Sequence, residues 1–128
     1  MQRHVVVAFM AAVLLLGTSV SGALAHANLL RSNIKNYQVF RLGHAPRMIT
    51  AFFAEELDPK PSWMAVFEGE ADHGLVNERQ HSVVNFKNPK EMTLRLPKLD
   101  RGKFYLIWYT RSTEDNHYAA GVIYFSVK

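Results

Sequence analysis

Short apolar stretches separated by turn residues recur along the chain after residue 26. Beta-branched and aromatic residues fill these stretches, whereas apolar positions with helical spacing are scarce, and this pattern is typical of strands. Glycine, proline, asparagine and aspartate between the stretches favour turns, which we expect at 42–46, 58–61, 88–89 and 100–102. We predict seven strands, at 29–32, 48–54, 62–68, 82–86, 92–96, 104–110 and 121–127.

The stretches at 104–110 and 121–127 are the most apolar of the seven. In the first, even-numbered residues share one face and odd-numbered residues the other; in the second, Ile123, Phe125 and Val127 oppose the even-numbered residues. Because these two stretches have the strongest apolar alternation, we expect them to be central strands. The whole pattern predicts an all-β fold, an antiparallel immunoglobulin-like sandwich, with Trp63 and Trp108 in its core.

The first 25 residues have the layout of a secretory signal peptide. Arg3 precedes an unbroken apolar run at 5–16, and small residues lead to Ala23-Leu24-Ala25. The alternative is a membrane anchor, but the run has 12 residues, against about 20 that a helix needs to cross a bilayer. We therefore expect a helical signal peptide at 1–25 that is cleaved after Ala25.

Cleavage would leave a single domain at 26–128, with 14 Lys plus Arg against 11 Asp plus Glu and thus a net charge of +3. These charges form no basic block, so no nucleic acid partner is expected. The chain has no cysteine, which excludes disulfides, thiolate ligands and a lipoprotein anchor. A soluble exported protein is the expected class.

Cleavage would also give His26 a property that no internal histidine has. The freed α-amine has a reference pKa of about 8, far below that of lysine, so a metal ion can displace its proton at neutral pH. The amine and the ring Nδ1 of His26 can then chelate one cation.

Asp115 and His117 lie two residues apart in STEDNHYAAG, a polar segment between the two expected central strands. With His26 they would make a site of three nitrogens and one oxygen. Such donors in tetragonal geometry favour Cu(II), although zinc accepts them in tetrahedral geometry. A histidine directly after the cleavage site also arises by chance, and Asp-x-His in a loop is often a solvated turn. The spacing does not show that His26, Asp115 and His117 lie close together in the fold.

Motifs at both ends of the mature chain resemble those of the CopC-like periplasmic copper-binding proteins. His26-Ala27-Asn28-Leu29 matches a His-Ala-x-Leu start that is followed by a serine, here Ser32. Further matches are GKFYLIW at 102–108, STEDNH at 112–117, Gly121 and FSV at 125–127, and APRMITAFFAEEL at 45–57 is similar to another strand of the family.

The resemblance implies a seven-stranded Greek-key barrel or cupredoxin-like sandwich in the periplasm. It implies Cu(II) binding through the amine and ring of His26, the carboxylate of Asp115 and the ring of His117. It also implies a role in copper homeostasis or resistance, beside a membrane copper protein of the CopD type. We expect a monomer without enzymatic activity.

Departures from the family pattern affect the expected first turn and the ligand loop. Ser32-Asn33-Ile34 stands where the family has Ser-x-Pro, and Asn116 replaces a common glycine, which asparagine can do because it accepts the left-handed conformation. Some members bind Cu(I) through a methionine-rich loop. The mature methionines here are far apart in expected strands, so we predict no such site; they are Met48, Met64 and Met92.

Several other polar residues are weaker candidates. His73 is either a further ligand or a surface residue. Glu55 or Glu56 would accept a hydrogen bond from a metal ligand without contacting the metal, as metal-bound histidines usually require. His44 and His81 are expected to be exposed turn residues.

Two other classes of function remain open from the sequence. One is a small copper oxidase or monooxygenase, since lytic polysaccharide monooxygenases also chelate copper through an amino-terminal histidine. A carboxylate at a coordination position and a chain too short for a substrate surface disfavour it. The other is a metal-free immunoglobulin-like assembly module.

Overall fold

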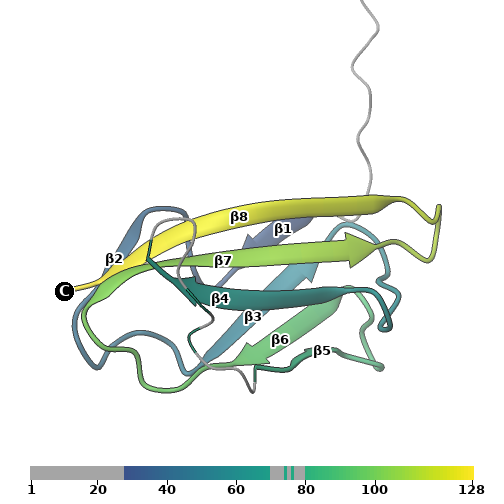
Figure 1. Cartoon of the computed structure of the whole chain (residues 1–128). Helices are drawn as coiled ribbons and strands as arrows, with labels where there is room; N and C mark the ends of the chain where they lie inside the picture. Colours follow the sequence, from purple (N-terminus) through teal and green to yellow (C-terminus); the bar gives the residue numbers. More distant parts are fainter. Residues whose placement is uncertain (1–27, 70–73, 75, 77–79) are drawn as a thin grey trace, which may run out of the picture.

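Two four-stranded sheets pack face to face in the computed structural model, which describes residues 28–69, 74, 76 and 80–128 (Figure 1). The first sheet has the order β1 (Leu29–Ser32), β3 (Met48–Phe53), β6 (Glu91–Arg95), β5 (Ser82–Val84). The second has the order β2 (Gln38–Phe40), β8 (Tyr118–Val127), β7 (Gly102–Arg111), β4 (Trp63–Glu68). Over these ranges we find no helix that could cross a membrane. The expected signal peptide at 1–25, His26 and His73 lie outside the described residues.

The all-β sandwich is confirmed, but the predicted count of seven strands is wrong, because the described residues form eight. The additional strand is β2, which pairs in parallel with the end of β8, from Gln38 beside Phe125 to Phe40 beside Val127. Three residues are too few to show an alternating pattern. The pairing of β2 also joins segments far apart in the sequence, so no local signal marks it.

β7 and β8 are the central strands of the second sheet, as predicted, and their alternation holds. Phe104, Leu106 and Trp108 of β7 point inward and are buried, and so are the three odd-numbered residues of β8 from Ile123 to Val127. They pack against the inner face of the first sheet, where the ring of Phe53 meets Trp108 edge-on at 5.6 Å between centroids. This layer between the sheets is the hydrophobic core.

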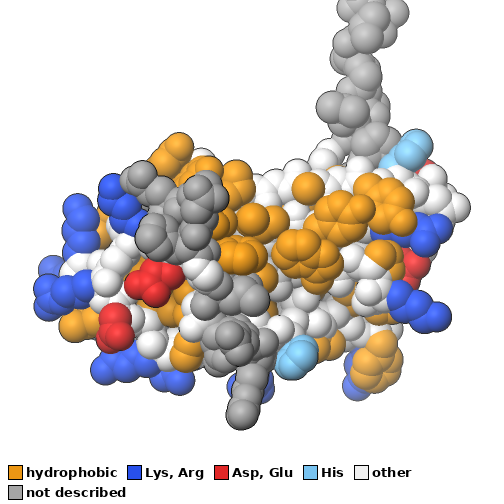
Figure 2. Space-filling model, in the orientation of Figure 1, with side chains coloured by type: hydrophobic (Ala, Val, Ile, Leu, Met, Phe, Trp, Pro, Cys, Tyr) orange, Lys and Arg blue, Asp and Glu red, His pale blue; other side chains and the backbone are white. Residues whose placement is uncertain are grey.

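Trp108 lies in the core as predicted, whereas the prediction for Trp63 is wrong. Trp63 begins β4 opposite Tyr109, in the register that faces away from the first sheet, and 42% of it is exposed. Figure 2 shows hydrophobic side chains gathered across this outer face, over β8, β7 and β4. The second sheet is therefore apolar on both sides.

Gly121 makes room for the indole of Trp108 across the β7–β8 pair. The two residues are paired in register, and a Cβ built on Gly121 would overlap Cζ2 and Cε2 of the ring and lie 2.8 Å from Nε1. Only glycine leaves room for the indole beside the β8 backbone at this position.

The outer edge of β4 is closed by side chains. The backbone N–H groups of Met64 and Val66 donate to Ser82 Oγ at 3.0 Å and to Gln80 Oε1 at 2.7 Å. The side-chain amide of Gln80 also donates back to the carbonyl of Val66 at 2.8 Å. Glu68 N–H donates to the carbonyl of Gly74 at 3.2 Å. These bonds satisfy backbone groups that an edge strand otherwise presents to another chain.

Candidate metal centre

The loop between β7 and β8 carries Asp115 and His117, at the end of the sandwich opposite the C-terminus (Figure 1). Asp115 Oδ2 lies 3.1 Å from Nδ1 of His117, and Oδ1 accepts the backbone N–H of His117 at 3.0 Å. The side chain of Asp115 is 33% exposed and that of His117 61% exposed. A carboxylate on Nδ1 fixes the imidazole tautomer that has its lone pair on Nε2. The pair is thus close, accessible and oriented.

The backbone of the loop is tightly closed, which holds the pair in place. Ser112 N–H donates to the carbonyl of His117 at 2.9 Å, and Asn116 N–H donates to the carbonyl of Ser112 at 3.0 Å. Asn116 has φ of 60°, which confirms that asparagine takes the left-handed conformation here. Arg111 Nη2 donates to Asn116 Oδ1 at 3.2 Å.

The segment that follows β3 braces the loop from the side. Thr113 N–H donates to the carbonyl of Glu56 at 2.9 Å, and Glu56 N–H donates to Glu114 Oε2 at 3.0 Å. Leu57 and Ser112 form an isolated antiparallel bridge. Hydrogen bonds therefore join two segments more than fifty residues apart at one end of the sandwich.

Glu55 reaches the loop through Ser112. The hydroxyl of Ser112, which is fully buried, donates to the Glu55 carboxylate and accepts the N–H of Glu114 at 3.0 Å. Glu56 contacts the loop through its backbone N–H and carbonyl groups. Of the two acidic candidates, Glu55 is the one whose side chain supports the loop. This role of Ser112 was not predicted from the sequence, although a small hydroxyl residue between a buried strand and an acidic loop is a signal for such a support.

The first described residues of the chain lie beside this bracing segment. Ala54 N–H donates to the carbonyl of Asn28 at 2.9 Å, and Leu29 pairs with Phe53. Ala54 immediately precedes Glu55 in the sequence. The start of β1 and the loop with Asp115 are thus attached to the same short segment.

The remaining candidates lie elsewhere. His44 and His81 are exposed, as predicted. Met64 and Met92 are buried in the core, in β4 and β6. In the ranges that the structure covers, no group of three or more His, Asp or Glu side chains is placed to hold a metal ion. The described part of the chain therefore supplies two of the predicted ligand residues.

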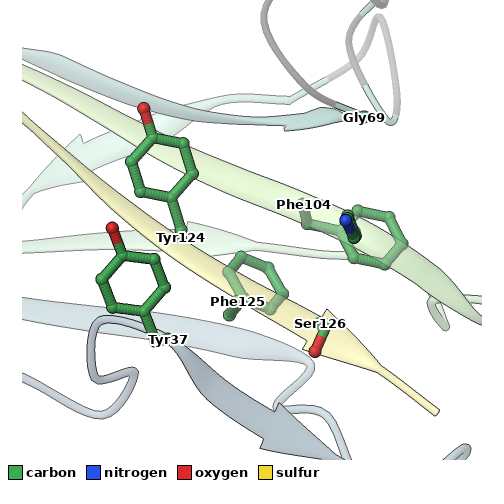
Figure 3. Close-up of a pocket in the computed structure, with 7 residues that line it drawn as sticks. Tyr37, Gly69, Phe104, Tyr124, Phe125 and Ser126 are labelled. Atoms are coloured by element: carbon green, nitrogen blue, oxygen red, sulfur yellow. The ribbon is translucent and has the colours of Figure 1, made fainter.

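A cavity of about 510 Å³ lies near the other end of β7 and β8. Its lining includes Tyr37, Lys103, Tyr124 and Ser126. Figure 3 shows the rings of Tyr37 and Tyr124 side by side, with their hydroxyl groups on the same side, and the rings stack at 5.9 Å with 13° between their planes. The cavity is remote from Asp115 and His117, so it is not the predicted metal centre.

Comparisons with known proteins show the family and the fold of this chain. No curated protein matches the chain. CopC from Methylosinus trichosporium OB3b superposes with a TM-score of 0.69, at 20% identity over 80% of this chain and 94% of that chain. PcoC, a methionine-rich copper resistance protein from Escherichia coli, has a TM-score of 0.64, at 25% identity over 80% of this chain and 99% of that chain. The CopC domain model matches residues 30–128, and this chain therefore belongs to the CopC family.

Proposed function

We propose that this protein binds Cu(II) in the periplasm and serves copper homeostasis or resistance without catalysing a reaction. Membership of the CopC family and the fold shared with a copper resistance protein support the copper-binding role. The observation that carries the proposal is the oriented pair of Asp115 and His117, 3.1 Å apart on a braced and accessible loop.

The ligands we propose are the amine and Nδ1 of His26, the carboxylate of Asp115 and an imidazole nitrogen of His117. His26 precedes Asn28 by two positions, and two residues span at most about 7 Å of chain. Asn28 is bonded to Ala54 beside the segment that braces the loop. The attachment of Asn28 at the end of the sandwich that carries Asp115 and His117 supports His26 as the third ligand residue.

These donors suit cupric copper as a cargo. Three nitrogens and one carboxylate oxygen favour Cu(II) over other divalent ions by the order of metal affinities. The exposure of His117 lets an ion enter and leave without opening the core. Release to a membrane copper protein of the CopD type is the transfer that we propose for the bound ion.

A Cu(II) titration of the purified exported protein tests the proposal. We expect one equivalent to bind with a visible d-d band and no oxidation of added oligosaccharide in the presence of hydrogen peroxide. Sugar oxidation would instead indicate an enzyme, and absence of binding would indicate an assembly module. Mass spectrometry of the same sample should show His26 as the first residue.

A matched control isolates the terminal chelate. A variant that retains one extra residue before His26 keeps every side chain but converts the amine to an amide, so we expect it to lose most of its Cu(II) affinity. Equal affinities of the two proteins would contradict the chelate.

A further inference from the structure

The outer side of the second sheet is covered by apolar residues, and we call this surface the aromatic face. It belongs to the strands β2, β8, β7 and β4 and the turn before β2. Its members are Tyr37, Val39, Trp63, Ala65, Phe67, Tyr105, Ile107, Tyr109, Tyr118, Ala120, Val122 and Tyr124. Antiparallel sheets with one solvated side usually place polar residues there, so this composition is unusual.

Cross-strand register arranges the aromatic face in rows. At the end near the β7–β8 loop, Tyr109 stacks on Trp63 at 6.1 Å and on Tyr118 at 5.4 Å. Ile107 and Val122 form the middle row. At the other end, four rings follow one another across the sheet with centroid separations of 5.2 to 6.2 Å; they are Phe67, Tyr105, Tyr124 and Tyr37.

Much of this apolar surface is exposed. Tyr37 is 75% exposed and Tyr118 52%, while Trp63, Val122 and Tyr124 are each 42% exposed. Tyr37 also has φ of 61°, a conformation that is uncommon for a bulky residue. A contiguous exposed apolar surface usually marks a site of interaction with a protein or a membrane.

Basic residues border the aromatic face. Lys103 stands at one end of β7 in the outward register, and Lys60 is exposed in the turn before β4. Arg111 stands at the other end of β7, where its guanidinium is paired with Asp58 at 3.6 Å and stays partly exposed. Lys35 and Lys128 are exposed near the end that carries Tyr37. Figure 2 shows Lys and Arg side chains at both ends of the hydrophobic band. Residues 26–128 have a net charge of +3.

We propose that the aromatic face is a membrane-binding surface for a bilayer that contains anionic phospholipid. Tyrosine and tryptophan favour the boundary between hydrocarbon and water, where the ring is buried and the polar atom stays hydrated. Lysine and arginine at the rim attract anionic headgroups. A bilayer fits both features. Its binding strength increases with the apolar area that is buried and with the attraction between basic residues and anionic lipids.

Vesicle binding by the metal-free protein tests this surface independently of copper. The vesicles are phosphatidylglycerol with phosphatidylcholine, and phosphatidylcholine alone is the comparison. We expect cosedimentation with the anionic vesicles and a blue shift of tryptophan emission. Trp63 is exposed while Trp108 is buried, so the shift reports on the aromatic face. Binding should weaken strongly at 1 M salt, where the Debye length is about 3 Å.

A double variant and a matched control locate the contact. Tyr118→Ser with Val122→Ser should lower the vesicle partition coefficient by about tenfold, because binding scales with the apolar area buried. Phe86→Ser removes an 88% exposed ring beyond the end of β5, in the other sheet, and should leave the partition unchanged.

Three results would overturn the proposal. One is the absence of cosedimentation and of an emission shift in the unaltered protein, a readout that needs no variant to fold. The second is a loss of partition with Phe86→Ser but not with the double variant. The third is that the protein sediments as a dimer without lipid and that its Trp63 emission is already blue-shifted. A second copy of the chain would then cover the aromatic face.

Discussion

The indole of Trp108 lies in the space that a side chain at Gly121 would need. The two residues face each other across the central β7–β8 pair, and the ring also touches Phe53 of the opposite sheet. The contact between the sheets therefore depends on a residue without a Cβ. Any larger residue at position 121 must push the indole toward the core.

Gly121→Ala should destabilise the fold by about 1–3 kcal/mol, because extra volume in a packed core forces side chains and backbone to shift. Urea unfolding would measure the change. Gly102→Ala is the control, since a Cβ there meets its nearest atom, Phe104 Cζ, at an ordinary 3.6 Å. Equal unfolding free energies for the two variants would contradict the close packing at Gly121.

Ser112→Ala should lower the free energy of unfolding by about 1–3 kcal/mol, because it leaves the half-buried Glu55 carboxylate and the N–H of Glu114 without their shared hydroxyl. Thr113→Ala is the control, because Thr113 is exposed and its hydroxyl makes a long bond of 3.4 Å to the carbonyl of Glu56. Denaturant unfolding of both proteins makes the comparison. If the two variants unfold alike, Ser112 does not support the loop.

Asn116→Ala should lower the free energy of unfolding by about 1–2 kcal/mol. The left-handed conformation brings Cβ close to the following carbonyl, and alanine lacks the polar side chain whose local hydrogen bonds offset this cost in asparagine. Asn116→Gly should fold with little loss, because glycine adopts positive φ freely. Thermal unfolding of both variants tests the difference. A loss as large for glycine as for alanine would assign the effect to the bond between Arg111 and Asn116 instead.

Removal of the proposed loop ligands should change the electron paramagnetic resonance spectrum of the Cu(II) protein. His117→Ala should remove one nitrogen from the hyperfine pattern, and Asp115→Asn should alter the spectrum while keeping the nitrogens. His44→Ala, at an exposed position away from the loop, should leave the spectrum unchanged. An unchanged spectrum for His117→Ala would remove that residue from the proposed site.

Patterns within one strand predicted much of the fold. The alternation in β7 and β8 correctly separated the buried Phe125 from the exposed Tyr124, because side chains alternate sides along a strand. Features that depend on distant partners were not predictable in this way. β2 owes its existence to β8, and Trp63 is exposed because its register with Tyr109 turns it outward.

The local sequence also predicted part of the candidate site, and the rest depends on contacts between distant residues. Asp115 and His117 are two residues apart, and a short polar segment between two strands was enough to predict that they share a loop. The support from Glu55 joins positions 57 apart, and only the folded chain brings that carboxylate to Ser112. Pairing of β1 with β3 likewise brings the start of β1 to this end of the sandwich.

The closed edge of β4 disfavours the growth of this protein into fibrils. An open strand beside an exposed apolar surface can template the addition of further chains, and the process then continues without limit. Here Gln80 and Ser82 already satisfy the amides of Val66 and Met64. An incoming strand would first have to displace these side chains, so the sheet can keep its hydrophobic exterior without polymerising along β4.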